Sequence, residues 1–513
     1  MRLLATLGSA IAWTRTFPPS AWWLLAWIGI APFLVAIRTA PTLARAVTLA
    51  WLWCMAFAWC VGAWLPRGVA GYFEQPLPIG IAFFLATATL TAGVQYMAFA
   101  AAYRALARRF ASLLPLLGTA AFVGAELARV RGPGADPWAL VGYSQAPVAT
   151  VTQIADVTGV YGVTFLVVAV NAALAELWIA RRDRRALRPA IRGLSITLLL
   201  AASIIVYGSL RLSDPTPASK SPASRRVCVV QGDVAMRAQW SPSDYGKNLD
   251  VYLRLTRDAL ARDAASLVVW PESAMTFFLD EESAYRRAIA GVISAHGTQL
   301  LAGAPRAVDA TRATFTNSAF LLAPDGAILG RYDKQRLLPF AEHFPLSIDA
   351  LRRRFGRVRQ FTPGGPAELL DTDAGRAGVL ICNEAFYGRL AAERVLAGAT
   401  WLVNLANDTW VSDSQFSRMA LDMARFRAIE QRRWLVRAST WGPSALVDPA
   451  GRVMAVTGTD TQAAACGAIE PLAETTAYAR LGDVFACACV LAVALALVWT
   501  ARPPGPPGLT PRA

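Results

Sequence analysis

The stretch Gly378-Val379-Leu380-Ile381-Cys382-Asn383-Glu384 joins a short apolar run to a thiol and two polar residues. Four apolar or small residues in a row are typical of a strand that is buried on both faces. In layered α/β folds, ligands gather beyond the carboxyl ends of such strands. The pattern therefore predicts a buried strand that presents Cys382 to a site. A core cysteine is the simpler interpretation, because free cysteines are among the most buried residues.

Two further apolar runs end in ionisable residues and favour the functional interpretation. Leu267-Val268-Val269-Trp270-Pro271-Glu272 places a carboxylate just past a strand, and Tyr332-Asp333-Lys334 follows the turn Ala323-Pro324-Asp325-Gly326. Either charge alone is more typical of a solvated surface residue. Together with the thiol of Cys382 they form a coherent set: a base for the thiol proton, a cation for a developing oxyanion, and a nucleophile.

The composition is that of a membrane protein with a globular portion. The chain has 513 residues, of which 55% are hydrophobic and 17% charged, whereas about 25% are charged in a typical globular protein. Apolar residues crowd into the first 211 positions and a final run. The net charge of +15 comes with arginines clustered in short loops between apolar segments. That distribution favours membrane topology over nucleic-acid binding.

Cysteines and histidines indicate neither a disulfide framework nor a metal site. The seven cysteines are odd in number, and four of them lie in apolar membrane runs. The two histidines, His296 and His343, have no Cys, His or carboxylate neighbours at metal-ligand spacing. We therefore expect no metal ion in the site.

Hydropathy predicts seven membrane spans before the soluble region and one after it. They lie near residues 3–14, 20–37, 46–64, 78–102, 112–129, 158–180, 191–211 and 484–500. Arginine-rich loops alternate with arginine-poor ones, which places the arginine-rich loops in the cytoplasm and the region from 212 to 483 outside. The arginines concerned are Arg38, Arg45, Arg104, Arg108, Arg109, Arg181, Arg182, Arg184, Arg185, Arg188 and Arg192.

The chain divides into four predicted parts. They are a seven-helix transmembrane domain at 1–211, a polar linker at 212–224, an extracytoplasmic domain at 225–480, and a C-terminal transmembrane helix with a cytoplasmic tail at 481–513. The loop 130–157 is rich in Gly, Pro, Trp and Tyr and faces the same side as the extracytoplasmic domain. It is either an interfacial anchor or one wall of a lipid entrance.

Within 225–480, short apolar runs alternate with helical stretches. In Gln415 to Gln431, apolar residues recur at three and four positions while charged residues, Glu430 among them, face elsewhere. Alternation of this kind gives a layered α/β domain. The strand-like runs are 227–230, 267–270, 299–302, 319–322, 378–381, 401–405, 434–436 and 445–447.

The order of the motifs resembles a known family. Trp-Pro-Glu-Ser around Glu272, Tyr-Asp-Lys at Lys334 and Ile-Cys-Asn-Glu around Cys382 are similar to the nitrilase, or carbon-nitrogen hydrolase, superfamily. The closer resemblance is to its membrane-embedded branch, the apolipoprotein N-acyltransferases. Further similar motifs cover nearly the whole chain, at 137–138, 142–145, 230–233, 338–342, 407–410, 423–430 and 478–480.

The resemblance implies a four-layer αββα catalytic domain at 225–480, held on the periplasmic side of a bacterial inner membrane. Cys382 would attack an acyl ester of a phospholipid, and Glu272 would shuttle the proton. Lys334 and the backbone amide of Asn383 would stabilise the oxyanion. The α-amine of a diacylglyceryl-cysteine apolipoprotein would then take the acyl chain from the thioester, without any cofactor.

Supporting roles also follow from the resemblance. Glu342 would orient the lysine, Glu384 would be structural, and Trp240 would lie near the acyl pocket. Asn383 stands where the family usually has a tyrosine, and further departures occur at Val411, Ser412, Met419, Ala420, Thr440 and Trp441. These departures leave two alternatives: a membrane-tethered acyltransferase or amidohydrolase with a different acceptor, and a catalytically silent scaffold that binds lipoproteins.

Overall fold

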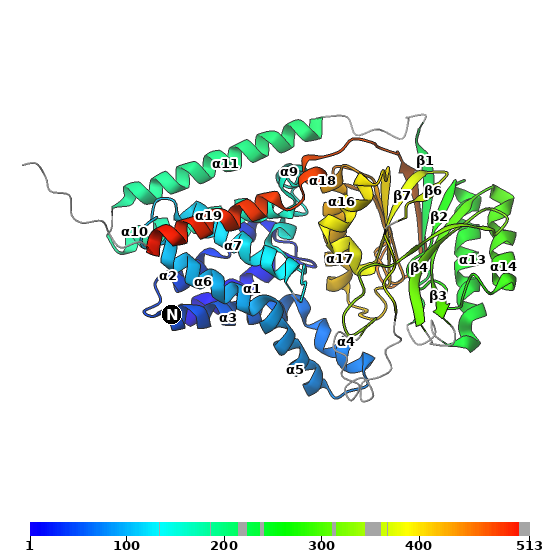
Figure 1. Cartoon of the computed structure of the whole chain (residues 1–513), viewed down its shortest axis with the longest axis horizontal. Helices are drawn as coiled ribbons and strands as arrows, with labels where there is room; N and C mark the ends of the chain where they lie inside the picture. The colour runs from blue at the N-terminus through cyan, green and yellow to red at the C-terminus, as the bar shows by residue number, and fades with distance from the viewer. Residues whose placement is uncertain are drawn as a thin grey trace, which may run out of the picture.

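The computed structural model describes residues 1–513 except 133, 185, 214–222, 236–240, 310–313, 344–360, 367 and 502–513. A helical bundle and an α/β sandwich lie next to each other along the longest axis (Figure 1). Most of the predicted linker, the predicted acyl-pocket residue Trp240, Arg185 and nearly all of the C-terminal tail lie outside the described residues.

The bundle has a helix at each predicted apolar stretch. Its main helices are α1 (Arg2–Thr14), α2 (Ala31–Arg38), α3 (Leu43–Gly62), α5 (Leu77–Ala88), α6 (Val94–Leu106), α7 (Leu114–Arg131), α10 (Val160–Arg182), α11 (Leu187–Ser213) and α19 (Val484–Ala501). Among the residues described, four helical segments are long and apolar enough to cross a membrane: 43–62, 77–106, 160–182 and 187–213. Two shorter apolar segments lie at 23–38 and 484–500. The total of eight spans stays a prediction.

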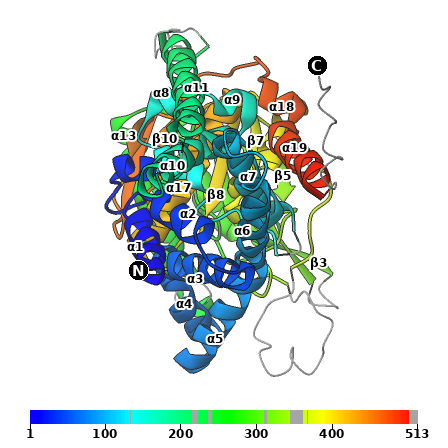
Figure 2. The same cartoon turned by 90° about the vertical axis from the view of Figure 1, so that its left-hand side faces the viewer.

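The helices differ in how much of their surface the bundle covers. In α10, 72% of the most apolar window is buried inside the protein, against 22% in α11. Helix α11 runs along the outside of the bundle, on the side opposite α5 (Figures 1 and 2). It exposes large apolar side chains such as Leu199, Val206 and Leu210. A row of exposed apolar residues on an outer helix is what contact with lipid requires.

Two six-stranded sheets pack face to face in the sandwich. The first has the order β12-β1-β2-β3-β4-β5 and the second β11-β10-β9-β8-β7-β6. Each of the eight predicted strand-like runs contains a strand. The strands are β1 (Arg225–Gln231), β2 (Leu267–Val269), β3 (Gln299–Asp309), β4 (Thr314–Leu322), β5 (Ile328–Asp333), β6 (Leu370–Thr372), β7 (Gly375–Ile381), β8 (Trp401–Ala406), β9 (Leu435–Ser439), β10 (Ala445–Val447), β11 (Val453–Val456) and β12 (Ala463–Ile469).

Helices cover the outer face of each sheet. Helices α13 (Tyr245–Arg262) and α14 (Ser283–Ile293) cover the first sheet on the side away from the bundle. Helices α16 (Gly388–Leu396) and α17 (Ser414–Gln431) cover the second sheet and lie between it and the bundle (Figure 1). The result is the predicted four-layer αββα sandwich. We call the second sheet with α16 and α17, next to the bundle, the membrane-side half, and the first sheet with α13 and α14 the solvent-side half. The strand that precedes Cys382, β7, belongs to the membrane-side half.

Helix α17 is buried on two sides, and the sequence pattern indicated only one. Its sheet-facing side is made of the smaller residues Leu421, Ala424 and Ala428. Glu430, expected to face away from the core, is fully buried. The prediction for Glu430 is therefore wrong, because the bundle covers the face that a free-standing domain would leave in water. The apolar stripe that the sequence shows joins the bundle core through Met419, Met423, Phe426 and Ile429.

The loop 130–157 is part of this junction. Trp138 stacks on Phe416 of α17 with ring centroids 5.1 Å apart, and the buried ring of Tyr143 packs edge-on against Phe426 at 5.0 Å. The Tyr387 hydroxyl donates a hydrogen bond to the Ala135 carbonyl at 2.6 Å. These contacts make the loop an internal packing element that holds the sandwich against the bundle.

A disulfide joins the first and last strands of the sandwich. Cys228 of β1 and Cys466 of β12 are directly opposite each other in an antiparallel pair, with Cα atoms 4.1 Å apart. The cysteine pattern in the sequence did not reveal this disulfide. The two cysteines are 238 residues apart, and only the pairing of these strands makes them neighbours.

Candidate active site

The ends of three strands bring the predicted triad together. Glu272 follows β2, Lys334 follows β5 directly, and Cys382 follows β7 directly. The Lys334 Nζ atom lies 3.5 Å from Glu272 Oε1, and the Glu272 carboxylate forms a hydrogen bond with the Cys382 thiol. Glu272 and Lys334 are buried, whereas Cys382 is partly exposed. The three residues therefore form one cluster at the strand ends.

The backbone at Cys382 turns sharply. Cys382 has a φ of 54°, in the left-handed region that non-glycine residues rarely adopt. It begins the 3₁₀ turn η7 (Cys382–Phe386). The Asn404 side chain supports this geometry by donating to the carbonyls of Leu380 at 3.0 Å and Cys382 at 3.2 Å. Strain of this kind, on the order of 1–3 kcal/mol, persists only where neighbouring contacts hold it, and it is concentrated at functional sites.

Glu384 ties the cysteine turn to the lysine loop. Its carboxylate accepts hydrogen bonds from the backbone N–H groups of Ile381, Gln335 and Arg336 at 2.7, 2.8 and 3.0 Å. The side chain is fully buried. Glu384 thus ties the loop after Lys334 to the turn at Cys382.

Glu342 and one residue that the sequence did not reveal complete the surroundings of Lys334. The Lys334 ammonium lies 2.9 Å from Glu342 Oε1 and 2.8 Å from Oε2. Asn317, in the middle of β4, donates from Nδ2 to Glu272 Oε1 at 2.7 Å and to Glu342 Oε1 at 2.8 Å. The Asn407 N–H donates to Glu272 Oε2 at 2.8 Å. An amide inside a buried strand was the only signal of Asn317 in the sequence.

Burial and charge set the protonation of the site. Burial, with the nearby Glu272 carboxylate, raises the pKa of the Cys382 thiol well above its ordinary value, although Lys334 opposes this. Burial also raises the pKa of Glu272 against the opposing effect of Lys334. For Lys334, burial alone would lower the pKa, but Glu342 and Glu272 raise it well above its ordinary value. The resting site therefore holds a neutral thiol beside an ammonium group and needs a base during attack.

The departures from the family pattern lie at different distances from the thiol. Asn383 follows it directly, is buried, and has no hydrogen-bond partner for its Oδ1 atom among the described residues. Thr440 donates to Asn407 Oδ1 at 2.9 Å and so supports the loop that contacts Glu272. Met419 instead packs in the bundle core. In the described part of the chain, no group of three or more His, Cys, Asp or Glu residues is suited to hold a metal ion.

Comparison with known proteins covers both halves of the molecule. The apolipoprotein N-acyltransferase N-terminal domain matches residues 9–173, and the carbon-nitrogen hydrolase family matches residues 226–478. The amidase of the nitrilase superfamily from Nesterenkonia is 18% identical, with a TM-score of 0.39, over 52% of this chain and 97% of the amidase. The apolipoprotein N-acyltransferase of Geobacter metallireducens is 33% identical over 504 residues, which are 96% of this chain and 94% of the relative. That of Gloeobacter violaceus is 30% identical over 525 residues, covering 97% and 93%. Because this similarity extends through the bundle and the sandwich, the chain belongs to the apolipoprotein N-acyltransferase family.

Proposed function

We propose that the protein transfers an acyl chain from a membrane phospholipid to the N-terminal α-amine of a diacylglyceryl-cysteine apolipoprotein. The observation that supports this function best is the cluster of Glu272, Lys334 and Cys382 on a domain that packs against an apolar helical bundle. Membership in the family points the same way. A lipid donor suits a thiol enzyme that is held at a bilayer.

In the first half-reaction, Cys382 Sγ attacks the ester carbonyl of the phospholipid as Glu272 takes the thiol proton. The Lys334 ammonium and the backbone N–H of Asn383 stabilise the oxyanion of the tetrahedral intermediate. Collapse of this intermediate breaks the bond to the glycerol oxygen, which receives the proton from Glu272. A lysophospholipid leaves, and the acyl chain stays on Cys382 as a thioester.

In the second half-reaction, the α-amine of the apolipoprotein attacks the thioester carbonyl. Glu272 accepts the proton that the amine loses, and the same two groups stabilise the oxyanion. The bond to Cys382 Sγ breaks, the thiolate regains its proton from Glu272, and an amide is released. Donor and acceptor occupy the site in turn, so we expect ping-pong kinetics and no cofactor.

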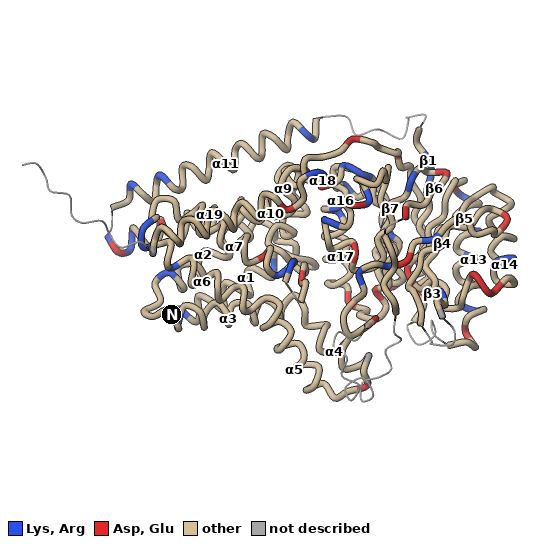
Figure 3. The backbone as a smooth tube through the Cα atoms, viewed as in Figure 1, with Lys and Arg blue, Asp and Glu red and all other residues tan. Residues whose placement is uncertain are grey.

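We place the sandwich on the periplasmic side of a bacterial inner membrane. Arg104 donates to the carbonyls of Ile37 and Ala40, and Arg109 donates to that of Trp499, so these chain segments meet at one end of the bundle. Arginine residues gather at this end of the bundle, opposite the sandwich (Figure 3). The positive-inside rule makes that end cytoplasmic. A topology reporter should read cytoplasm after Arg182 and periplasm at Asp325, and the reverse result would contradict this orientation.

Complementation tests the function directly. A bacterial strain depleted of its own apolipoprotein N-acyltransferase should grow when it expresses this chain, and its lipoproteins should carry an N-terminal amide-linked acyl chain by mass spectrometry. The Cys382→Ala variant should fail in both assays. A chain that forms a thioester without rescuing growth would point to a different acceptor. A chain that forms no thioester would be the silent scaffold.

The different acceptor is the second candidate because of Asn383. Its Oδ1 is buried, has no hydrogen-bond partner among the described residues, and belongs to the residue directly after the nucleophile. An Asn383→Tyr variant should speed transfer to apolipoprotein if the native acceptor is another amine, and should leave it equal or slower if apolipoprotein is the acceptor. Single-turnover decay of the thioester would measure this rate.

A further inference from the structure

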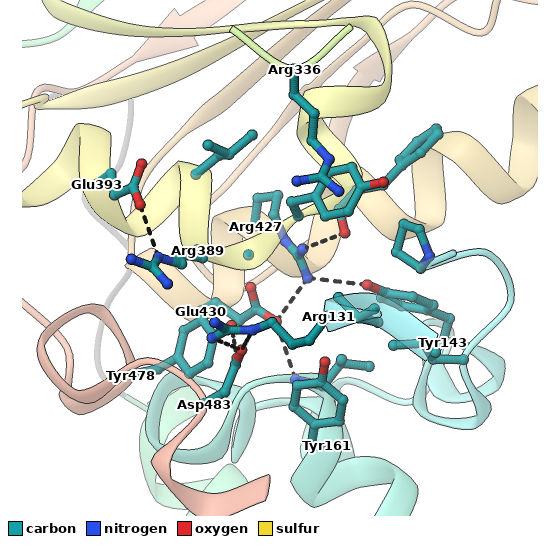
Figure 4. A pocket seen from close by; sticks show the side chains of 18 residues that line it. Arg131, Tyr143, Tyr161, Arg336, Arg389, Glu393, Arg427, Glu430, Tyr478 and Asp483 are labelled. Carbon is teal, nitrogen blue, oxygen red and sulfur yellow. Dashed lines mark hydrogen bonds and ion pairs between the residues drawn. The ribbon is translucent and has the colours of Figure 1, made fainter. Parts of the chain in front are cut away.

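A cavity of about 250 Å³ lies at the junction of the bundle and the sandwich (Figure 4). It is lined from the bundle by α7 and α10, and from the sandwich by the end of η7, α16 and α17. The triad residues do not line it, whereas Phe386 and Tyr387 do. A 3₁₀ turn rises about 2 Å per residue, so Phe386, at the end of η7, lies roughly 8 Å along the turn from Cys382. It is a neighbour of the candidate active site and separate from it.

The cavity wall carries more positive than negative charge. Among the described residues, the ionisable side chains of Asp, Glu and Arg that line it are Arg131, Arg336, Arg389, Arg427, Glu393, Glu430 and Asp483. Each acid is paired with an arginine: Asp483 with Arg131, Glu430 with Arg427 at 2.8 Å, and Glu393 with Arg389 at 3.0 Å. Arg336 is the one arginine of this set that has no acidic partner among the described residues.

Arg336 is held in place without a carboxylate partner among the described residues. Its guanidinium carbon lies 3.9 Å from the centre of the Tyr387 ring. Its backbone N–H is bound by Glu384, the residue that joins the lysine loop to the cysteine turn. Arg336 is only two residues from Lys334. Figure 4 shows its guanidinium entering the cavity from the sandwich side, while Arg131 approaches from the bundle side.

Arg427 offers a second donor to the same space. Its Nη1 donates to the Phe386 carbonyl at 3.1 Å and its Nη2 to the Tyr143 hydroxyl at 3.3 Å. Its buried Nε has no hydrogen-bond partner in the part of the chain that the structure describes. A buried N–H left unpaired costs on the order of 1–3 kcal/mol, so an acceptor in the cavity would be stabilising. Glu430 Oε2 likewise has no hydrogen-bond partner among the residues described, and burial raises the pKa of Glu430 to about 7. When protonated, Glu430 also donates, and the wall becomes more positive.

We propose that this cavity binds the phosphate of a membrane glycerophospholipid headgroup, with Arg336 as its main cationic partner and Arg427 as a second donor. The inference rests on the proposed function, because it seats the headgroup of the acyl donor beside the thiol. A surplus of one positive charge matches the single negative charge of a phosphodiester. The volume is below the roughly 300–1,000 Å³ of pockets for drug-sized ligands, so it suits a headgroup and leaves the acyl chains outside.

Binding to the full-length Cys382→Ala protein in detergent tests this proposal without any turnover. The probes are a fluorescent lysophosphatidylglycerol and a monoacylglycerol with the same labelled chain. Arg336→Gln should weaken binding of the lysophospholipid by roughly 10- to 100-fold and leave the monoacylglycerol unchanged. The matched control is Arg376→Gln, which removes an exposed arginine from the amino-terminal end of β7 and should change neither affinity.

Two results would overturn the proposal. One is an unchanged affinity of Arg336→Gln for the lysophospholipid, and the other is an equal loss for both probes, which would mean general damage to the junction. Inorganic phosphate separates the two sources of the anion: it should displace the lysophospholipid only at concentrations at least about 100-fold above the lipid. Displacement at equal concentrations would make this a site for free phosphate and contradict the lipid assignment.

Thioester formation by the wild-type protein separates this inference from the proposed function. Arg336-dependent binding of the lysophospholipid, without a thioester from phospholipid, would contradict the proposed function and retain the headgroup site. A thioester formed from phospholipid equally fast in Arg336→Gln and wild type, at limiting donor, would contradict the headgroup site and retain the proposed function.

Discussion

Helices α13 and α17 are both 18 residues long and both cover a sheet of the same sandwich, yet their surroundings differ. Helix α13 buries one face and exposes charged residues such as Arg254 and Arg257. Helix α17 packs on the second sheet with one face and on the bundle with the other, and its Arg427 and Glu430 are buried. Charges on a helix therefore do not identify a solvated face when a second domain covers it.

The two halves of the sandwich also differ in their cysteines and in their contacts with the bundle. The solvent-side half contains the disulfide of β1 and β12. The membrane-side half contains the strand that ends at the free thiol of Cys382, and its outer helix contacts both the bundle and the carbonyl of Phe386 in the cysteine turn. Glu272 and Lys334 follow β2 and β5 of the solvent-side sheet, so both halves contribute to the triad. We infer that the membrane-side half also couples the nucleophile to the bundle.

The largest expected effect concerns the thiol of the membrane-side half. Cys382→Ala should abolish acyl-enzyme formation and leave the protein folded, because alanine can occupy the place of the thiol at modest cost. Labelled phospholipid should leave a hydroxylamine-sensitive label on the wild-type protein and on Cys487→Ala, which changes an exposed free cysteine. Equal labelling of Cys382→Ala would show that another residue is the nucleophile.

The next prediction compares the stability of variants in the two outer helices, α17 and α13. Arg427→Leu should lower the free energy of unfolding by about 3 to 5 kcal/mol, because it leaves the buried Glu430 carboxylate without its partner. Arg257→Leu, on the exposed face of α13, should change it by no more than about 0.5 kcal/mol. Denaturant unfolding in detergent, followed by tryptophan fluorescence, measures both values. Similar losses in the two variants would mean that the junction does not depend on this charge pair.

Variants of Lys334 and Glu272, the charged partners of the thiol, should lose activity with different pH dependence. Lys334→Met removes an oxyanion donor worth about 3 to 4 kcal/mol and should slow thioester formation at every pH. Glu272→Gln removes the base, and it also removes the carboxylate that raises the pKa of Cys382. Because the thiol then ionises more readily as pH rises, Glu272→Gln should recover activity at alkaline pH. Single-turnover thioester formation across pH distinguishes the two, and recovery of both variants or of neither would contradict these roles.

The smallest effect concerns the solvent-side half. Cys228→Ser removes the disulfide and should lower the free energy of unfolding by about 2 to 4 kcal/mol. The rate of thioester formation per folded molecule should remain that of the wild type, because no residue of the triad directly follows β1 or β12. A change in that rate would show that the pairing of β1 with β12 also affects the position of the triad residues.

Much of the fold and of the candidate site could be predicted because the signals are local. The apolar runs before Glu272 and Cys382 marked both the strands and their functional tips, since the change from apolar to polar residues occurs within a few positions. The strand before Lys334, β5, was not among the predicted strand-like runs. Asn317 escaped notice because its partners, Glu272 and Glu342, come from other strands and loops. The residues next to Asn317 in the sequence therefore do not indicate which groups its amide will contact in the folded protein.

The amino-acid sequence by itself determined the helical bundle, the layered α/β class and the residue types of the triad, because hydropathy and strand periodicity act over short distances along the chain. Only the tertiary structure decided which faces meet. It paired Cys228 with Cys466, covered the second face of α17 with the bundle, and left Arg336 without a carboxylate partner, among the described residues, beside the cavity. These outcomes depend on strand order and domain docking, which are set by the packing of segments far apart in the sequence.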